Sequence, residues 1–517
     1  MIHDVLRLWV VAIILATWLG LKSAYRLSFH PLAGIPGPKK IACTHLYEFF
    51  YNVVRPGKFL FKIEEMHQQY GPLVRINPRE VHISDPSFYD EIYASSRRTR
   101  DKDPKFVPTY ALPDSIVATV DHELHRFRRS ILKGFFSRHS VLELSEVINE
   151  RVQKLMQRFR EFQMNESVLC LDDAFAALTS DIITSYCCGK HRGFLEDEYF
   201  RNDIRRATAD AMEFGHICRF CPWLVYALRI LPPRAIATLM PGKAAVFEFL
   251  ASLLDDPATA MHEKTSPTPT TGSQLTRKTM VAALADPSIP LKERSYNRLR
   301  DETFAIIAAG TETTTRVLTV AAYHLARDED LRDTLRAELK RVMPTLDARP
   351  TWPELEKLPY MSGVVDESLR LSYGLTGRLP RVAPTEALKY KDYVIPSGTP
   401  ISSSSYILHR DASIFPDPER FDPERRVKAA QNGDNLKKYL TSFTKGSRAC
   451  IGINLAYMEL FLTVAHLVRR FDMELYDTEA EDVRIVRDMN MGYTRRGKLR
   501  VYAKLSSAEG SGSLLCS

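Results

Sequence analysis

The sequence has little excess charge of either sign. Its 517 residues include 71 lysines and arginines against 63 aspartates and glutamates, a formal net charge of +8. Spread over so long a chain, and without runs that alternate basic and aromatic residues, this excess argues against nucleic acid as a partner. A basic face for an acidic protein or a membrane surface remains open. With 45% hydrophobic and 26% charged residues, the composition is that of a globular protein with a large core.

Cysteine is scarce and irregularly spaced. The eight cysteines are Cys43, Cys170, Cys187, Cys188, Cys218, Cys221, Cys450 and Cys516. They share no repeating spacing, which argues against a disulfide framework. Cys218 and Cys221 form a lone CxxC, but no second CxxC or HxxxH follows at the distance of a zinc finger. We interpret this pair as two small buried thiols.

One long apolar run stands at the N-terminus. Residues Val5–Leu21 are apolar except for Arg7 and Thr17, and a helix of this length reaches about 25 Å. A secretory signal is the alternative, but no small-x-small cleavage site follows. We therefore predict that residues 1–22 form a single-pass membrane anchor outside the chemistry. More basic residues follow the run than precede it (Lys22, Arg26, Lys39 and Lys40 against Arg7), which places the rest of the chain in the cytosol.

The remainder of the chain shows no internal repeat and is predicted to form one domain, residues 41–505. Before it, residues 23–40 form a stiff proline-rich hinge, because the prolines of HPLAGIPGP exclude a helix. Residues 71–85 contain two short apolar alternations around Asn77-Pro78, which predict a β-hairpin. Most other segments have helical periodicity, so the fold class is mainly α with small β-sheets, an α+β fold. Residues 265–274 are predicted to be an exposed loop, and residues 506–517 a flexible tail.

The strongest motif is the segment from Phe443 to Gly452, which has the form FxxGxRxCxG. A thiolate ligand of haem iron needs glycines, here Gly446 and Gly452, that let backbone amides approach the sulfur. Arg448 is suited to pair with a haem propionate. An amphipathic helix over residues 453–471 would follow, and its N-terminal dipole favours a thiolate at Cys450.

This segment resembles the cysteine signature of the cytochrome P450 family, in which the matching cysteine is the metal ligand and Phe443 and the glycines lie against the haem. Residues 291–326 contain no proline and predict one long helix. Its centre, AGTETT from Ala309 to Thr314, matches the family's oxygen-activation sequence. The resemblance implies that Ala309 and Gly310 adjoin the haem and that Glu312 and Thr313 are catalytic. A threonine that bonds back to its own helix is the alternative for Thr313.

Glu367 and Arg370 match the family's ExxR pair. The same spacing occurs at Glu123 with Arg126 and at Glu338 with Arg341, and such pairs are usually solvated. Only the first pair lies between the long helix and the PERF-like sequence PERR at 423–426. The resemblance implies that Arg425 completes a buried triad with Glu367 and Arg370 that braces the haem loop. Here the usual aromatic residue is replaced by Arg426.

Other family positions are expected to hold the haem propionates. The family's WxxxR motif matches HRFRR, in which His125 replaces the tryptophan and Arg129 keeps its place. Arg381, in LPRV, falls where the family has another propionate partner. With Arg448 these residues would supply three cations for two carboxylates.

The substrate pocket is predicted from helical spacing and from the last loop of the family fold. Counting back from Thr313 places Gly310, Ala309, Ile306, Ala305 and Glu302 on one face, mostly small and apolar. Met489 and Met491 fall in the family's last substrate-contacting loop, although core packing is the alternative for both. We therefore expect a lipophilic substrate, a terpenoid or polyketide scaffold.

The resemblance covers nearly the whole chain. The segments YRLSFHPLAGIPGPKK, RDKDPKFVP and TVDHELHRFRRSILKGFFS are similar to fungal members of the trichodiene oxygenase group. The family implies a haem b monooxygenase of the endoplasmic reticulum membrane that uses dioxygen. Without a GxGxxG region the chain would need a separate NADPH-cytochrome P450 reductase. The alternatives are a reductase-independent isomerase or lyase and a haem sensor, which need no proton delivery by Glu312 and Thr313.

Overall fold

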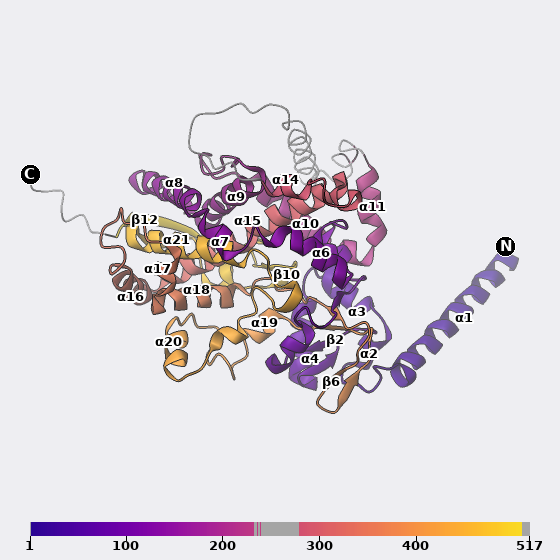
Figure 1. Ribbon diagram of the computed structural model, residues 1–517. Coiled ribbons are helices and arrows are strands. Elements are labelled where there is room, and N and C mark those ends of the chain that lie inside the picture. Colours follow the sequence, from indigo (N-terminus) through magenta and orange to yellow (C-terminus); the bar gives the residue numbers. More distant parts are fainter. Residues whose placement is uncertain (1, 232–234, 236–237, 239–278, 509–517) are drawn as a thin grey trace, which may run out of the picture.

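The N-terminal helix projects away from the body of the protein in the computed structural model, which describes residues 2–231, 235, 238 and 279–508 (Figure 1). Helix α1 (Ile2–Ala24) continues into a wider turn, η1 (Tyr25–Phe29), so residues 23–29 of the predicted hinge are helical, and a further helix begins at Lys39. None of its most apolar stretch is buried, and among the described residues only His3–Phe29 is long and apolar enough to cross a membrane. The Arg26 guanidinium donates to the Cys43 carbonyl at the start of the body.

The core is built around one long helix, α15 (Tyr296–Arg327), as predicted. It begins five residues later than expected, because Ser295 has an extended backbone and residues 291–294 form a separate tight turn. Helices α9 (Leu171–Cys188), α10 (Asp203–Phe220), α18 (Pro359–Ser372) and α21 (Ile453–Arg470) pack against α15. Their apolar faces form the largest hydrophobic cluster of the described residues.

Shorter helices surround this core, and several begin at a side-chain cap. Asp121 accepts from the Leu124 N–H at the start of α6, and Thr351 and Glu354 form a capping box at α17. The shorter helices are α2 (Lys39–Cys43), α3 (Leu46–Phe49), α4 (Phe59–Tyr70), α5 (Tyr89–Ile92), α6 (His122–Lys133), α7 (Arg138–Leu142), α11 (Pro222–Ile230), α14 (Met280–Leu284), α16 (Glu329–Leu339), α17 (Trp352–Glu356), α19 (Ser405–Leu408), α20 (Glu424–Gln431) and α22 (Ala480–Val483). The longer α8 (Ser145–Met164) lies among them and packs against α9 and α21.

A five-stranded sheet lies beside the helical core, in the order β1-β2-β8-β5-β3. The predicted hairpin is confirmed: β1 (Leu73–Arg75) pairs antiparallel with β2 (Val81–Ile83). Strand β8 (Pro400–Ser402) runs parallel to β2 and antiparallel to β5 (Arg381–Val382). At the far edge β5 pairs with β3 (Asp101–Lys102), and this register sets Lys102 directly opposite Arg381.

Three smaller sheets complete the fold. They are β4 (Leu169–Cys170) with β12 (Tyr502–Ser507) and β9 (Phe471–Tyr476), β6 (Leu388–Tyr390) with β7 (Tyr393–Ile395), and β10 (Arg487–Asp488) with β11 (Gly492–Tyr493). Strand β12 extends to Ser507, so the first two residues of the predicted tail are paired with β9. The predicted loop 265–274 and residues 509–517 lie outside the described part. The mainly α fold with small sheets is as expected.

Candidate active site

Cys450 lies in a tight loop directly before α21. Its N–H donates to the Phe443 carbonyl at 2.9 Å. Gly446 has a φ of +74°, and a Cβ at this position would lie 2.1 Å from the Tyr93 carbonyl oxygen, so only glycine fits. Burial raises the pKa of the Cys450 thiol, while the Gly452 N–H and the Arg129 guanidinium lower it. The side chain is nevertheless exposed.

The middle of α15 presents a second accessible patch in an otherwise buried helix. Ala309 is exposed and Gly310, Glu312 and Thr313 are half-buried, whereas Ala305 and Ile306 are buried. The Thr313 hydroxyl donates to the Ala309 carbonyl at 2.8 Å. Thr313 therefore bonds back to its own helix, which is the alternative to a catalytic role. A Cβ on Gly310 would lie 2.8 Å from Cγ1 of Ile183. Close packing of α15 on α9 therefore requires this glycine.

Glu312 contacts a basic residue that the sequence did not single out. The Nε of Arg205 lies 3.4 Å from its carboxylate, and Arg205 also pairs with Asp172 at 2.6 Å. A cavity of about 10 Å³, lined by residues that include Glu312 and Met491, adjoins this group. Glu312 and Thr313 are therefore neighbours in sequence whose side chains bond to different partners.

The ExxR side chains meet in a buried ion pair. Arg370 donates from Nε and Nη2 to the two oxygens of Glu367 at 2.8 and 2.7 Å. It also donates to three carbonyl oxygens of the segment 409–420. Nε of Arg425 lies 3.7 Å from Glu367, so the three predicted residues converge. Arg426, in place of the family's aromatic residue, pairs with Asp366 at 2.9 Å, a partner that the sequence did not indicate.

The two other ExxR pairs have different environments. Glu123 and Arg126 approach to 3.4 Å, and about two-thirds of each side chain is exposed. Glu338 instead accepts from the N–H groups of Tyr360 and Met361 at 3.0 and 2.8 Å, at the start of α18. The Glu367 pair is thus distinguished by burial and by its backbone contacts.

Four basic side chains gather between the Cys450 loop and the edge of the five-stranded sheet: Lys102, Arg129, Arg381 and Arg448. Each donates to backbone carbonyl oxygens, and in the part of the chain that the structure describes none forms an ion pair. Burial and the neighbouring Arg381 lower the pKa of Arg448 to about 9. Burial, Arg448 and Lys102 lower the pKa of His125 to about 2, so its imidazole is neutral.

These residues fit a haem by their chemistry. A thiol in a glycine-containing loop suits the iron. Buried and half-buried cations that have no carboxylate partner among the described residues suit two propionates. The sequence identified three of the four cations and His125. It missed Lys102, because a lysine between two aspartates, in the segment Asp101-Lys102-Asp103, carries no distinguishing spacing. Only the register of β3 on β5 brings it to Arg381.

A cavity with a volume of about 690 Å³ lies beside this site. It is lined mainly by apolar side chains of the segment 104–120 and of the α10–α11 corner. None of the predicted pocket residues Ala305, Ile306, Met489 and Met491 is among them. Met489 and Met491 are both 2% exposed, as the core-packing alternative expects.

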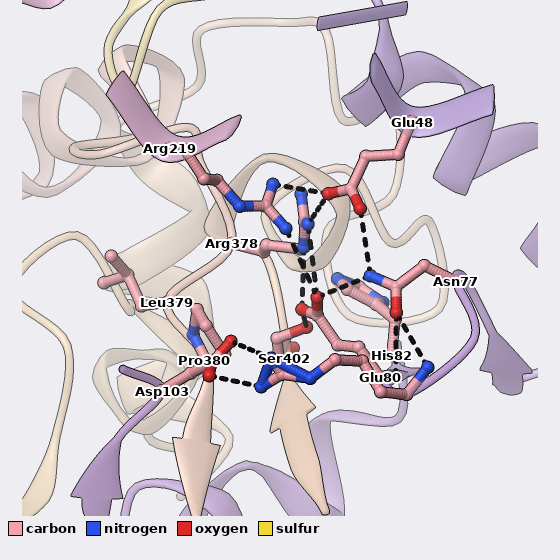
Figure 2. Close-up of polar contacts among 12 residues, drawn as sticks. Glu48, Asn77, Glu80, His82, Asp103, Arg219, Arg378, Leu379, Pro380 and Ser402 are labelled. Carbon is pink, nitrogen blue, oxygen red and sulfur yellow. Dashed lines mark hydrogen bonds and ion pairs between the residues drawn. The ribbon is translucent and has the colours of Figure 1, made fainter. Parts of the chain in front are cut away.

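A buried ionic cluster, drawn in Figure 2, lies beside this cavity, and three of its residues (Asn77, Glu80 and Arg219) line the cavity. Arg378 bonds both Glu48 and Glu80, with Nε 2.7 Å from Glu80, and Arg219 pairs with Glu48. Asn77 donates to both carboxylates at 3.1 and 3.0 Å. Although burial raises it, the two arginines hold the pKa of Glu48 well below its usual range. The cluster fastens α3, the β1–β2 hairpin and the end of α10 to the segment before β5.

We expect Glu367→Gln to lower the free energy of unfolding by about 3–5 kcal/mol, because it leaves the Arg370 charge buried without a counter-charge. Glu123→Gln, which opens the exposed pair of identical spacing, should lower it by less than about 1 kcal/mol. Chemical denaturation of the three proteins measures both values. Equal effects of the two changes would show that burial does not distinguish the ExxR pair.

Comparison with known proteins agrees with this geometry. The model of the family described as "Cytochrome P450" matches residues 42–491. The chain is 42% identical over 485 residues to the cytochrome P450 monooxygenase TRI4 of Trichoderma arundinaceum, covering 92% of this chain and 93% of that one. It is 43% identical over 479 residues to the conidiogenone synthase PchP450 of Penicillium rubens (92% and 95%), and 43% identical over 488 residues to the monooxygenase aflU of Aspergillus parasiticus (94% and 96%). The chain belongs to the cytochrome P450 family of haem-thiolate monooxygenases.

Proposed function

We propose that this enzyme hydroxylates or epoxidises a terpenoid or polyketide scaffold, with haem b held by Cys450. The observation that carries the proposal is the exposed Cys450 beside Arg129, next to a cluster of cations that form no ion pair among the described residues. The accessible patch of α15 supports it. Dioxygen is the oxidant, and the electrons come from NADPH through a separate reductase. The chain is anchored in the endoplasmic reticulum membrane by α1, with the domain in the cytosol.

When bound, a haem with a thiolate ligand supplies the reductive activation of dioxygen. Cys450 is the thiolate ligand, and the Gly452 N–H that lowers the pKa of its thiol stabilises the charge. Arg129, Arg381 and Arg448 bind the propionates, and the neutral His125 donates a further hydrogen bond. The Glu367 triad holds the chain between α18 and the cysteine loop in place, because Arg370 bonds carbonyls of residues 409–420.

Thr313 and Glu312 control protons beside the accessible patch of α15. The Thr313 proton is committed to the Ala309 carbonyl, so its oxygen lone pairs are free to accept from a water in the active site. Glu312 relays protons, because its carboxylate can accept a proton from solvent water and pass it on; the ion pair with Arg205, which also binds Asp172, holds that carboxylate in place. Delivery through these two side chains serves dioxygen reduction, and neither an isomerase nor a sensor requires it.

The substrate class is inferred from the apolar surroundings. Ala305, Ile306 and Ala309 offer no polar side chain, and the wall of the large cavity is mainly apolar. Such surfaces favour lipophilic scaffolds. The similarity to a conidiogenone synthase supports a role in secondary metabolism.

The reductase is proposed to dock near the cysteine loop. Lys437 and Lys438 are exposed ahead of this loop, and their charges suit an acidic surface on the reductase.

Thr313→Ala should lower the product formed per NADPH by about tenfold or more, with peroxide released instead, because a positioned proton carrier is lost. Thr319→Ala is the matched control, since its hydroxyl makes the same bond to the residue four positions earlier at 2.8 Å. The assay follows NADPH, peroxide and product in membranes that contain the reductase. Unchanged coupling in Thr313→Ala would favour the isomerase or sensor alternative.

Ala309→Phe should block or redirect oxidation of apolar scaffolds while haem stays bound, because the ring fills the accessible patch of α15. Ala309→Ser, which keeps the volume small, should retain the product pattern. Product analysis with a panel of terpene and polyketide scaffolds, together with substrate-induced spectral titrations, measures this. An unaltered product and rate in Ala309→Phe, or preferred binding of a small polar acid, would contradict the proposed pocket.

A further inference from the structure

Lys102 stands where a positive charge is costly. Its direct cross-strand partner is Arg381, and like charges at opposed positions of an antiparallel pair destabilise a sheet. Burial, Arg381 and Arg448 hold the pKa of Lys102 well below its usual range. An anion bound between these cations would relieve their mutual repulsion.

The nearby acidic side chains are committed to other partners. Asp101 accepts from the His122 N–H at 2.9 Å, and Asp121 accepts from the Leu124 N–H at 2.7 Å. Glu302 is bound by Arg298 and by the Ile116 N–H. None of the three forms an ion pair with Lys102, and within the described ranges neither does any other carboxylate.

Lys102 also forms hydrogen bonds with the backbone segment that lines the 690 Å³ cavity. Its ammonium donates to the Val117 carbonyl and its N–H donates to the Val120 carbonyl at 3.0 Å. Arg448 donates to the carbonyls of Thr119 and Val120 at 2.7 and 2.6 Å. Ala118 and Val120 line the 690 Å³ cavity. The basic cluster and the cavity therefore share one segment of backbone.

We propose that Lys102 is a further binding residue for the haem carboxylates, and that its simultaneous bond to Val117 couples haem retention to the order of residues 103–120. An ammonium has three donors, so one can hold a carboxylate oxygen while another keeps the Val117 carbonyl. The proposal rests on the proposed haem site at Cys450. It adds a fourth cation, from a segment that the cysteine and ExxR motifs do not include.

The test uses the full-length haem-loaded protein in detergent. Lys102→Met keeps the length of the side chain and removes its charge and donors. Haem transfer to excess apomyoglobin should then be about tenfold faster or more, since a charge-assisted hydrogen bond is lost. Amide hydrogen exchange should rise in residues 103–120. Lys102→Arg should restore both values towards those of the parent protein.

Lys105→Met is the matched control, because Lys105 is exposed in the same segment and lines the same cavity. It should leave haem transfer unchanged. Haem transfer as slow in Lys102→Met as in the parent protein would overturn the proposal, even if hydrogen exchange rose. Equal acceleration by Lys105→Met would also overturn it, since a general charge effect would suffice. Neither haem transfer nor hydrogen exchange requires turnover. A failure of the proposed oxygenation would therefore be distinguished from a failure of the inference about Lys102.

Discussion

The gathering of like charge beside the cysteine loop is the constraint on which the rest of the site depends. Lys102, Arg381 and Arg448 come from β3, β5 and the loop before α21. In the described part of the chain each donates its hydrogen bonds to backbone carbonyls and forms no ion pair. In the proposed haem site, a bound dicarboxylate would convert this repulsion into attraction, and the same group would then join the sheet to the core. The thiol of Cys450 and the accessible patch of α15 would then determine how a bound haem activates dioxygen.

The ionic clusters around this centre are buried and connect segments far apart in the sequence. The Glu367 cluster joins α18 to the segment that leads to the cysteine loop. The Glu48 cluster joins the N-terminal region to the end of α10 (Figure 2). Buried ion pairs add little net stability, but losing one partner is costly. Their effect is to hold the segments around the site in one arrangement.

The sequence predicted what depends on local spacing. The cysteine loop, the existence of one long helix at α15, the β1–β2 hairpin and the Glu367–Arg370 pair all follow from residues that are near in sequence. It could not predict Lys102, Arg205 or Asp366, because their roles arise from a two-residue strand pairing and from helices that meet in the folded chain. At Gly310 the two sources give different reasons for a glycine. The motif suggests a role in dioxygen activation, whereas the structure shows that α15 packs tightly against Ile183 at this position.

The most direct test is the carbon monoxide difference spectrum of the reduced protein, compared between Cys450→Ser and Cys170→Ser. Cys170 is half-buried beside Asp172 and lies outside the cation cluster. If Cys450 is the thiolate ligand, its replacement abolishes the thiolate-specific band, while Cys170→Ser retains it. Persistence of that band in Cys450→Ser would contradict the assignment of the haem site.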